Sequence, residues 1–353
     1  MKGTAIVYSE NEFGKLDGKV ANGLARQSDS YKILGVIDSS KAGLDAGEYL
    51  DEIANDIPVF RDISDAITQL PTVPDYFIYG IAPWEAFLTS EQREVIFNAM
   101  ELGMNIVSGL PQFLTLDEEF IKKSRQYNVT INDVRKPPLR KDLHSFSGRI
   151  NEVTTPVINV MGTDCAVGKR TTAQKLVTAL KEDGLNAVMI TTGQTGMLQG
   201  SKYGIALDVL TSGFATGELE NAILRAVEEE NPDIIIVEGQ GALGHPAFTS
   251  SSAIIRGAMP NALIIQHPPK RIKRCDFPGI AMPTLESEIE LLEVFSKVKV
   301  IAITLNHHDM SDAEEAQTMV EYEYANNIPT QEEMNDGFVK QGGLVYCSFR
   351  AVV

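Results

Sequence analysis

Short apolar runs alternate with amphipathic stretches along the first third of the chain. The apolar runs are rich in Val, Ile, Tyr and Phe, which is typical of buried strands, and the stretches between them place apolar residues at helical spacing. Strands are predicted over residues 4–8, 33–37, 59–60, 76–80 and 105–107, with helices over 15–26 and 90–101. Because strands and helices alternate, we predict a doubly wound parallel sheet.

The second half of the chain shows the same alternation. A buried strand is predicted over 157–161, followed by a glycine-containing loop and a helix over 169–182. Further strands are predicted over 187–191, 234–238, 262–266 and 298–305, and further helices over 218–229 and 284–294. The fold class is therefore expected to be α/β, with a second parallel sheet.

Two adjacent prolines separate the halves. Pro137 and Pro138 open a polar stretch, and proline disfavours the interiors of helices and strands. At about 150 residues per domain, a chain of 353 residues has room for two domains. We therefore predict an N-terminal domain over 1–138, a linker over 139–155 and a C-terminal domain over 156–353.

Composition matters here mainly for what it excludes. With 31 basic and 48 acidic residues the formal net charge is −17, which repels nucleic acid but still allows a small anion in a local positive pocket. The three cysteines, Cys165, Cys275 and Cys347, are too widely spaced to indicate a disulfide framework or a four-cysteine zinc site. We find no signal peptide and no apolar run of about 18 residues, so we expect a cytoplasmic protein without a membrane partner, and by default a homo-oligomer.

The first strand of the chain is not followed by a nucleotide-binding turn. The turn from Ser9 to Gly14 lacks the G-x-G-x-x-G pattern, so no pyrophosphate nest is expected there. Asp38 does follow the second strand, where a dinucleotide-binding fold places its ribose-binding carboxylate. Without the glycine turn, we do not expect this half to bind NAD.

The strongest chemical signal is the loop between the first strand and the first helix of the second half. It reads Gly-Thr-Asp-Cys-Ala-Val-Gly-Lys-Arg-Thr-Thr. Glycines let backbone N–H groups converge on an anion, the helix N-terminus adds partial positive charge, and the lysine supplies a full charge. The pattern predicts a phosphate-binding loop, whose candidate contacts are Gly162, Thr163, Asp164, Val167, Gly168, Lys169, Arg170, Thr171 and Thr172.

Two departures from the standard G-x-x-x-x-G-K-[ST] pattern affect the chemistry. Five residues separate Gly162 from Gly168 where the pattern has four, and this longer loop resembles that of dethiobiotin synthetase. Arg170 stands where a hydroxyl would bind Mg²⁺ beside nucleotide phosphates, and a guanidinium repels a cation. Unless Thr171 takes that place, the loop is expected to hold an anion without a catalytic metal, such as the ADP moiety of coenzyme A.

Polar residues follow the strand predicted at 187–191. Thr192 and Gln194 lie where a parallel sheet binds its ligands, so they are either ligand contacts or ordinary turn residues. Asp208, further along the chain, is a second candidate carboxylate.

The strand predicted at 234–238 ends in a carboxylate. Glu238 is followed by Gly239, Gly241 and His245, and this Val-Glu-Gly-x-Gly segment resembles the one that faces the reaction centre of dethiobiotin synthetase. Burial at the end of an apolar strand would raise the pKa of Glu238, which suits a general base. A metal ligand or an ion-pair partner for Lys169 are the alternatives.

A basic segment follows the strand predicted at 262–266. Its cations are expected to bind the carboxylates of an acidic substrate, to bind the 3′-phosphate of coenzyme A, or simply to be solvated; they are Lys270, Arg271, Lys273 and Arg274. Asn306 ends the last strand and is a candidate adenine contact. The pair His307–His308 does not predict a metal site, because adjacent residues of an extended segment point in opposite directions.

Taken together, these segments resemble the D-glutamate N-acetyltransferase (DgcN) family of bacteria and archaea, long described as a family of unknown function. The resemblance covers nearly the whole chain and is carried by residues 105–110, 133–138, 162–172 and 237–246. It implies a Rossmann-like N-terminal domain and a P-loop NTPase-like C-terminal domain. It also implies an N-acetyltransferase of D-amino-acid catabolism, which transfers acetyl from acetyl-CoA to an acidic amino acid, D-glutamate above others, with Mg²⁺ not essential.

The resemblance also suggests roles for the candidate residues. The phosphate loop would hold the phosphates of coenzyme A, and Glu238, or else Asp208 or His245, would take a proton from the substrate amine. Amides near Gly239 and Gly241 would stabilise the tetrahedral oxyanion, and the basic segment would bind the substrate carboxylates. Two other functions stay open: an ATP- and Mg²⁺-dependent ligase or kinase resembling dethiobiotin synthetase, and a nucleotide-binding protein without chemistry.

Overall fold

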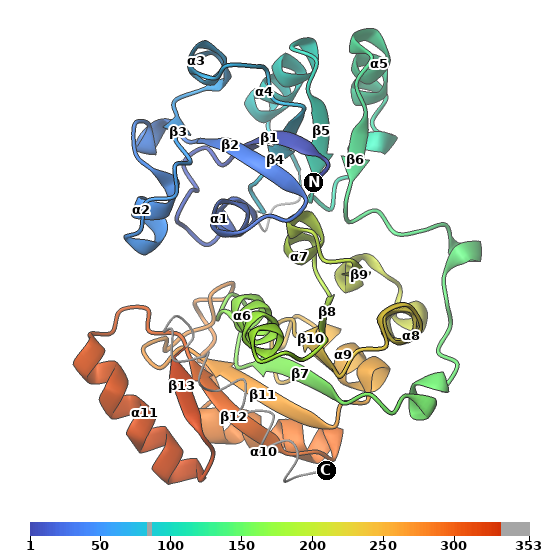
Figure 1. Ribbon diagram of the computed structural model, residues 1–353, viewed down its shortest axis with the longest axis vertical. Helices are drawn as coiled ribbons and strands as arrows, with labels where there is room; N and C mark the ends of the chain where they lie inside the picture. The colour runs from blue at the N-terminus through green and yellow to red at the C-terminus, as the bar shows by residue number, and fades with distance from the viewer. Residues whose placement is uncertain (83–86, 333–353) are drawn as a thin grey trace. The chain divides into compact units, whose positions relative to one another are not determined.

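The computed structural model describes residues 1–82 and 87–332, and its chain forms two compact units (Figure 1). The N-terminal unit contains residues 1–137 together with the short segment 193–202. The C-terminal unit contains residues 138–192 and the chain from Tyr203 onward.

The N-terminal unit is built on a six-stranded parallel sheet in the order β3-β2-β1-β4-β5-β6. Its strands are β1 (Gly3–Tyr8), β2 (Tyr31–Ile37), β3 (Val59–Phe60), β4 (Tyr76–Tyr79), β5 (Asn105–Ser108) and β6 (Ile131–Asp133). Its helices are α1 (Lys19–Arg26), α2 (Ala46–Asp51), α3 (Ile63–Gln69), α4 (Ser90–Glu101), α5 (Glu118–Tyr127) and α7 (Gln194–Gln199). The strand order is that of a Rossmann fold, which confirms the predicted doubly wound sheet.

The C-terminal unit contains a seven-stranded sheet in the order β13-β12-β11-β7-β10-β8-β9, again with every pair parallel. Its strands are β7 (Val157–Gly162), β8 (Ala187–Thr191), β9 (Tyr203–Gly204), β10 (Ile234–Glu238), β11 (Ala262–His267), β12 (Val300–Leu305) and β13 (Thr330–Glu332). Its α-helices are α6 (Lys169–Glu182), α8 (Ser212–Glu230), α9 (Ser250–Ala258), α10 (Leu285–Ser296) and α11 (Asp312–Asn326). The second parallel sheet is thus also confirmed.

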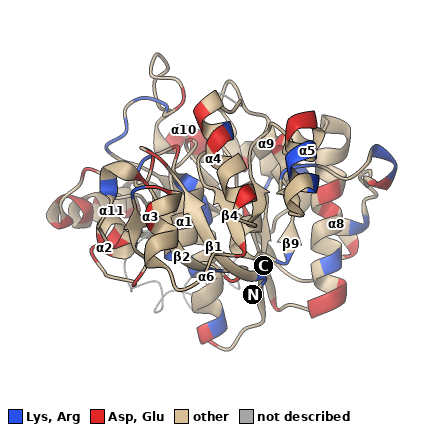
Figure 2. Cartoon of the chain, turned by 90° about the horizontal axis from the view of Figure 1, so that it is seen from above, with Lys and Arg blue, Asp and Glu red and all other residues tan. Residues whose placement is uncertain are grey.

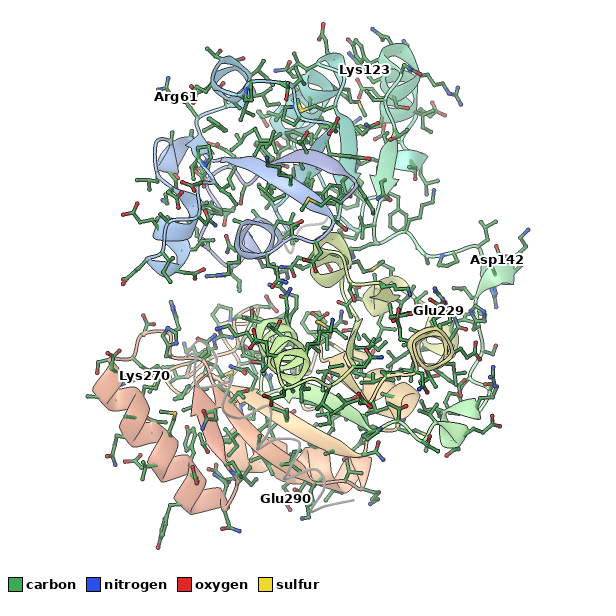
Figure 3. The ribbon with its side chains drawn as sticks, viewed as in Figure 1. Arg61, Lys123, Asp142, Glu229, Lys270 and Glu290 are labelled. Carbon is green, nitrogen blue, oxygen red and sulfur yellow. The ribbon has the colours of Figure 1, made fainter. Side chains whose placement is uncertain are left out.

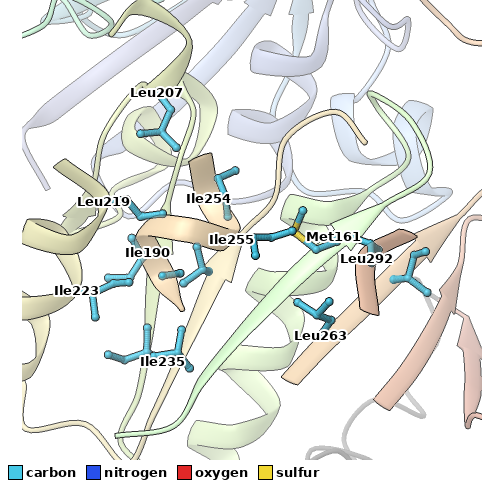
Figure 4. Close-up of a cluster of buried hydrophobic side chains, with 14 of the residues drawn as sticks. Met161, Ile190, Leu207, Leu219, Ile223, Ile235, Ile254, Ile255, Leu263 and Leu292 are labelled. Atoms are coloured by element: carbon cyan, nitrogen blue, oxygen red, sulfur yellow. The ribbon is translucent and has the colours of Figure 1, made fainter. Parts of the chain in front are cut away.

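Helices cover both faces of this second sheet, which is why its central strands are mostly apolar. One face packs on α6 through buried residues such as Leu176 and Leu180. The other packs on α8, α9 and α10, where buried side chains of the strands, such as Met161, Ile235 and Leu263, meet helix residues (Figure 4). Because both faces are buried, the strands show continuous apolar runs instead of alternation.

Local sequence fixes where several helices begin. Thr89 and Gln92 form a capping box at the start of α4, and Ser311 and Glu314 form another at α11. The helix predicted from residue 15 begins later, at Lys19, because Gly14 and Gly18 occupy the turn before it and Gly14 has a φ of 81°. In the described part of the chain, no helix is long and apolar enough to cross a bilayer.

The segment carrying α7 belongs to the N-terminal unit although it follows β8 in the sequence. The Gln199 side chain donates to the carbonyls of Gly23, at 2.7 Å, and Gln27, at 2.9 Å. The Gln199 carbonyl accepts from the Asp29 N–H at 2.7 Å. The chain therefore passes between the two units at three places along the sequence.

Residues 139–155 pack on α8 within the C-terminal unit. The Glu220 carboxylate accepts from the backbone N–H groups of Ser147, at 2.6 Å, and Ile150, at 3.1 Å.

Figure 2 shows acidic residues distributed over helices such as α8 and α11. The net negative charge therefore lies largely on helix surfaces.

Candidate functional site

The phosphate loop joins β7 to α6 at the carboxyl edge of the second sheet. Gly168 immediately precedes α6 with a φ of 111°, a conformation that glycine adopts without strain. Gly162 lies close beneath the loop, since a Cβ there would come within 3.0 Å of the Lys169 side chain. These glycines permit the tight path that aims backbone N–H groups of the helix start toward an anion.

Lys169 is buried inside this loop. Its Nζ donates to the backbone carbonyl of Asp164 at 2.5 Å. Burial lowers the pKa of Lys169, while the neighbouring Cys165 and Asp164 oppose that shift. A buried cation held by a single loop carbonyl is well placed to exchange that partner for an entering anion.

Asp164 binds the basic segment to the phosphate loop. Its fully buried carboxylate accepts from the backbone N–H of Cys275 at 2.9 Å. It also pairs with Arg271 and Arg274, each at 3.3 Å. The loop therefore has a negative charge beneath it that is matched by two guanidinium groups.

Both arginines also donate to carbonyls of the loop. Arg271 reaches the carbonyls of Cys165 and Ala166, at 2.8 and 3.0 Å. Arg274 reaches those of Thr163 and Gly244, each at 3.2 Å. The arginines predicted to contact substrate thus hold the loop in shape, and their role toward substrate stays a prediction.

Lys270, by contrast, is partly exposed. Its Nζ pairs with Glu314 of α11 at 2.6 Å. Figure 3 labels Lys270 among the side chains of the C-terminal unit. This ion pair lowers the pKa of Glu314 to about 2. Exposed pairs of this kind exchange partners easily, so Lys270 is available to an acidic ligand.

Glu238 is buried at the end of β10. Its carboxylate accepts from the Thr191 hydroxyl and from the Thr192 N–H, the latter at 3.2 Å. Burial raises the pKa of Glu238, and the Thr191 hydrogen bond and the charges of Arg170 and Lys169 oppose that rise. The raised pKa agrees with the expectation from sequence, and Thr192 is brought beside the carboxylate as its backbone partner.

The residues after Glu238 follow a constrained path. A Cβ on Gly239 would lie 2.3 Å from the carbonyl of Val160, so no side chain fits there. Gly241 has a φ of 54° and lies near Cys165, with 3.8 Å between its virtual Cβ and that Sγ. The Gln240 side chain donates to the Thr192 carbonyl at 2.6 Å and links this turn to the end of β8.

His245 lies against the phosphate loop. Its Nδ1 accepts from the Ala247 N–H at 3.2 Å, so the neutral ring carries its proton on Nε2. That Nε2 is buried without a hydrogen-bond partner, 3.6 Å from Asp164 Oδ1. Burial lowers the pKa of His245, and the charge of Arg274 lowers it further.

One group of side chains in residues 1–82 and 87–332 has the spacing of a metal site. Donor atoms of Asp164, Cys165 and His245 lie within 4.8 Å of one another. Two features weigh against a cation there: the proton sits on Nε2 of the histidine, and Arg271 and Arg274 already match the carboxylate charge. The group is better suited to hydrogen bonding at the loop.

A buried polar chain supports the loop from below. The Thr172 hydroxyl donates to Gln266 Oε1 at 2.6 Å, and the Thr304 hydroxyl donates to the same oxygen. The Thr163 hydroxyl lies 2.9 Å from Nδ1 of His267, whose pKa burial lowers to about 4. Sequence analysis missed Gln266. A glutamine at the end of the apolar run Ala-Leu-Ile-Ile-Gln could have indicated a buried polar residue near the loop.

Four other predicted residues have different surroundings. Asn306 donates from Nδ2 to the Val167 carbonyl at 3.1 Å, so its amide contacts the loop itself. Arg170 and Thr171 are partly buried at the start of α6. Asp208 is exposed in a short 3₁₀ helix, Leu207–Val209.

Gln194 belongs to the other unit. It begins α7, and that helix belongs to the N-terminal unit, where the Gln194 side chain lies next to Gly109. We expected Gln194 at the edge of the second sheet because it follows β8 in the sequence. The sequence alone does not show that the segment after Thr192 belongs to the N-terminal unit.

Comparison with known proteins gives consistent matches over both units. A family described as the DUF1611 C-terminal P-loop domain, of unknown function, matches residues 144–341, and the DUF1611 N-terminal Rossmann-like domain matches residues 39–137. A crystal structure of a DUF1611 family protein from Anabaena variabilis has a TM-score of 0.86 and 27% identity, covering 99% of both chains.

Two curated relatives carry the name D-glutamate N-acetyltransferase. The protein from Pseudoalteromonas is 32% identical over 267 residues, and the protein from Tritonibacter scottomollicae is 26% identical over 266 residues. Each alignment covers 74% of this chain and 78% of the relative.

Proposed function

The chain belongs to the DUF1611 family, and on that premise we propose that it is an N-acetyltransferase. Its substrate in this proposal is the amino group of an acidic amino acid, with D-glutamate as the leading candidate. The acetyl donor we propose is acetyl-CoA. The names of the two curated relatives support the reaction class, and the phosphate loop supports a donor that carries phosphates.

The observation that carries the proposal is a buried lysine in a phosphate loop with Arg170 at the position of the Mg²⁺-binding hydroxyl. Phosphate transfer needs a metal to neutralise the developing charge, whereas acyl transfer needs the phosphates only as a binding handle. In this proposal Gly168, Lys169, Arg170 and Thr171 hold the phosphates of coenzyme A.

Acyl transfer requires a base for the amine and donors for the oxyanion. The amine attacks the thioester carbonyl as a base takes its proton, and Glu238 is our first choice, ahead of His245 and Asp208. The raised pKa of Glu238 brings its proton affinity closer to that of a working base. Amides near Gly239 and Gly241 would donate to the tetrahedral oxyanion.

The same assignment sets a condition on the donor. Because Glu238 lies within electrostatic reach of Lys169, a base there requires the pantetheine arm to fold back toward the pyrophosphate. Lys270, with its exchangeable partner Glu314, is the first candidate to bind a substrate carboxylate. Arg271 and Arg274 would contribute by adjusting the loop on which they already lie.

A thiol-release assay tests this function. Full-length protein is mixed with acetyl-CoA and each of D-glutamate, L-glutamate, D-aspartate and D-alanine, with and without EDTA, and free coenzyme A is measured. We expect release with D-glutamate that EDTA does not reduce. A parallel thermal-shift series compares coenzyme A with Mg²⁺–ATP; stabilisation by Mg²⁺–ATP alone, without thiol release, would show that the protein is a nucleotide-dependent enzyme or a binding protein.

A further inference from the structure

Two cysteine side chains meet at the phosphate loop. Cys165 lies within the loop, and Cys275 lies at the end of the basic segment, 110 residues later. The Cys275 N–H donates to the Asp164 carboxylate at 2.9 Å, and its Sγ lies 3.5 Å from the Cys165 carbonyl. Both side chains are only partly buried.

The surroundings differentiate the two sulfurs. The neighbouring Cys275 thiol and the charge of Lys169 lower the pKa of the Cys165 thiol, and burial opposes that shift. The neighbouring Cys165 thiol and burial raise the pKa of Cys275. When two neighbouring thiols differ in acidity, the more acidic sulfur is the better placed to attack an oxidant and the other to resolve the product.

We propose that Cys165 and Cys275 form a reversible disulfide when the protein meets a peroxide, and that this bond locks the phosphate loop. The Cys165 sulfur attacks one oxygen of hydrogen peroxide, which breaks the O–O bond and yields a sulfenic acid and, after protonation, water. The Cys275 sulfur then attacks the sulfenic sulfur. Its proton leaves with the displaced hydroxide as a second water, so two thiols are oxidised and one peroxide is reduced.

The bond would fix the loop in the conformation described here. In this conformation Lys169 is bound to the Asp164 carbonyl and Arg271 to the Cys165 carbonyl. An entering anion competes with that carbonyl for Lys169, and in our proposal the loop between Gly162 and Gly168 adjusts as Lys169 turns to the anion. A covalent link from the middle of the loop to the basic segment restricts that adjustment, so the oxidised protein should bind anions more weakly.

Thiol counting with peptide mapping tests the disulfide itself. Reduced full-length protein has three cysteines, and treatment with hydrogen peroxide should lower the titratable thiols from three to one, with a 165–275 cross-linked peptide that dithiothreitol removes. C165S and C275S should give no such peptide. C347S, which alters a residue outside the described ranges, is the matched control and should still lose two thiols. Loss of thiols without the 165–275 peptide, or a disulfide through Cys347, would overturn the proposal.

A binding measurement tests the lock. This arm rests on the proposed function, because coenzyme A is the probe. Its affinity for the oxidised protein should fall at least about tenfold and return after reduction; unchanged affinity of the mapped disulfide form would overturn the lock. Reduced protein that binds no coenzyme A but still forms the 165–275 disulfide would instead count against the proposed donor, so the two failures are distinguishable.

Discussion

The carboxyl edges of the two sheets can be compared directly, because both sheets are parallel and flanked by helices. Each edge carries a buried carboxylate where a strand ends: Asp38 directly after β2 and Glu238 at the end of β10. In a doubly wound fold this edge is where ligands bind. The two edges nevertheless differ in what surrounds the carboxylate.

In the N-terminal unit the carboxylate of Asp38 accepts its hydrogen bonds from two neighbouring turns. Asp38 accepts from the N–H groups of Phe13, at 3.0 Å, and Ser40, at 2.9 Å, and from the Ser40 hydroxyl at 2.6 Å. These bonds fix two turns, and the carboxylate needs no cation. Asp38 is thus a structural residue, consistent with the missing glycine turn.

In the C-terminal unit the buried charges form a network instead. Glu238 interacts with Lys169 and Arg170, and Asp164 pairs with Arg271 and Arg274. Burying several charges is costly unless each is matched, so such a network at a ligand-binding edge indicates a site for a charged ligand. The comparison teaches that the same fold provides both edges, while only the second edge has the glycine loop and buried cations on which the proposed function rests.

The largest expected effect comes from replacing Glu238, the buried carboxylate at the carboxyl edge of the C-terminal sheet. We expect Glu238→Gln to lower kcat about 100- to 10,000-fold if Glu238 is the base. A base acts as carboxylate, so the wild-type rate should rise with pH through the raised pKa of Glu238, and the variant should lack that rise. Steady-state thiol release between pH 5 and pH 9 measures both.

Asp38→Asn is the control for this experiment, since that carboxylate is buried at the equivalent edge but bonds only to its own turns. Its kcat should stay close to that of the wild type. A Glu238→Gln protein that keeps both its rate and its pH profile would assign the base to another residue.

The second prediction compares the stability of the two edges. Asp164→Asn leaves two guanidinium groups without a buried counter-charge, and we expect it to destabilise the C-terminal unit by about 3–5 kcal/mol. Asp38→Asn loses part of a hydrogen-bond set that contains no cation, and should cost about 1–2 kcal/mol. Urea unfolding, with hydrogen exchange to locate the loss in one unit, measures the difference; equal losses would contradict the charge network.

These differences define what the sequence could predict. The strands were predictable because both faces of each sheet are covered, so apolar runs such as Ile234–Glu238 stand out. The loop was predictable because its glycines, Lys169 and the following helix are contiguous. What could not be predicted depends on contacts between distant segments: Arg271 on the carbonyl of Cys165, and α7 in the other unit.

The third prediction concerns the strength of anion binding. Lys169→Ala removes the buried cation of the loop, and we expect coenzyme A to bind about 10- to 100-fold more weakly, because a hydrogen bond to a charged group contributes about 1.5–3 kcal/mol. Lys181→Ala is the matched control, an exposed lysine in the last turn of the same helix. Isothermal titration calorimetry measures both affinities. Equal affinities for the two variants would show that the loop is not the phosphate site.

The smallest expected effect concerns two asparagine side chains, Asn306 in the C-terminal unit and Asn105 in the N-terminal unit. Asn306→Ala removes the hydrogen bond from Nδ2 to the Val167 carbonyl, worth about 1 kcal/mol, so coenzyme A should bind roughly fivefold more weakly. Asn105 makes the corresponding kind of contact in the N-terminal unit, from Nδ2 to the Asp75 carbonyl at 3.1 Å, but this carbonyl is not part of the phosphate loop. Asn105→Ala should therefore leave the affinity unchanged in the same titration. A loss much larger than fivefold for Asn306→Ala would mean that the amide contacts the ligand directly, as an adenine contact would, and not only through the loop.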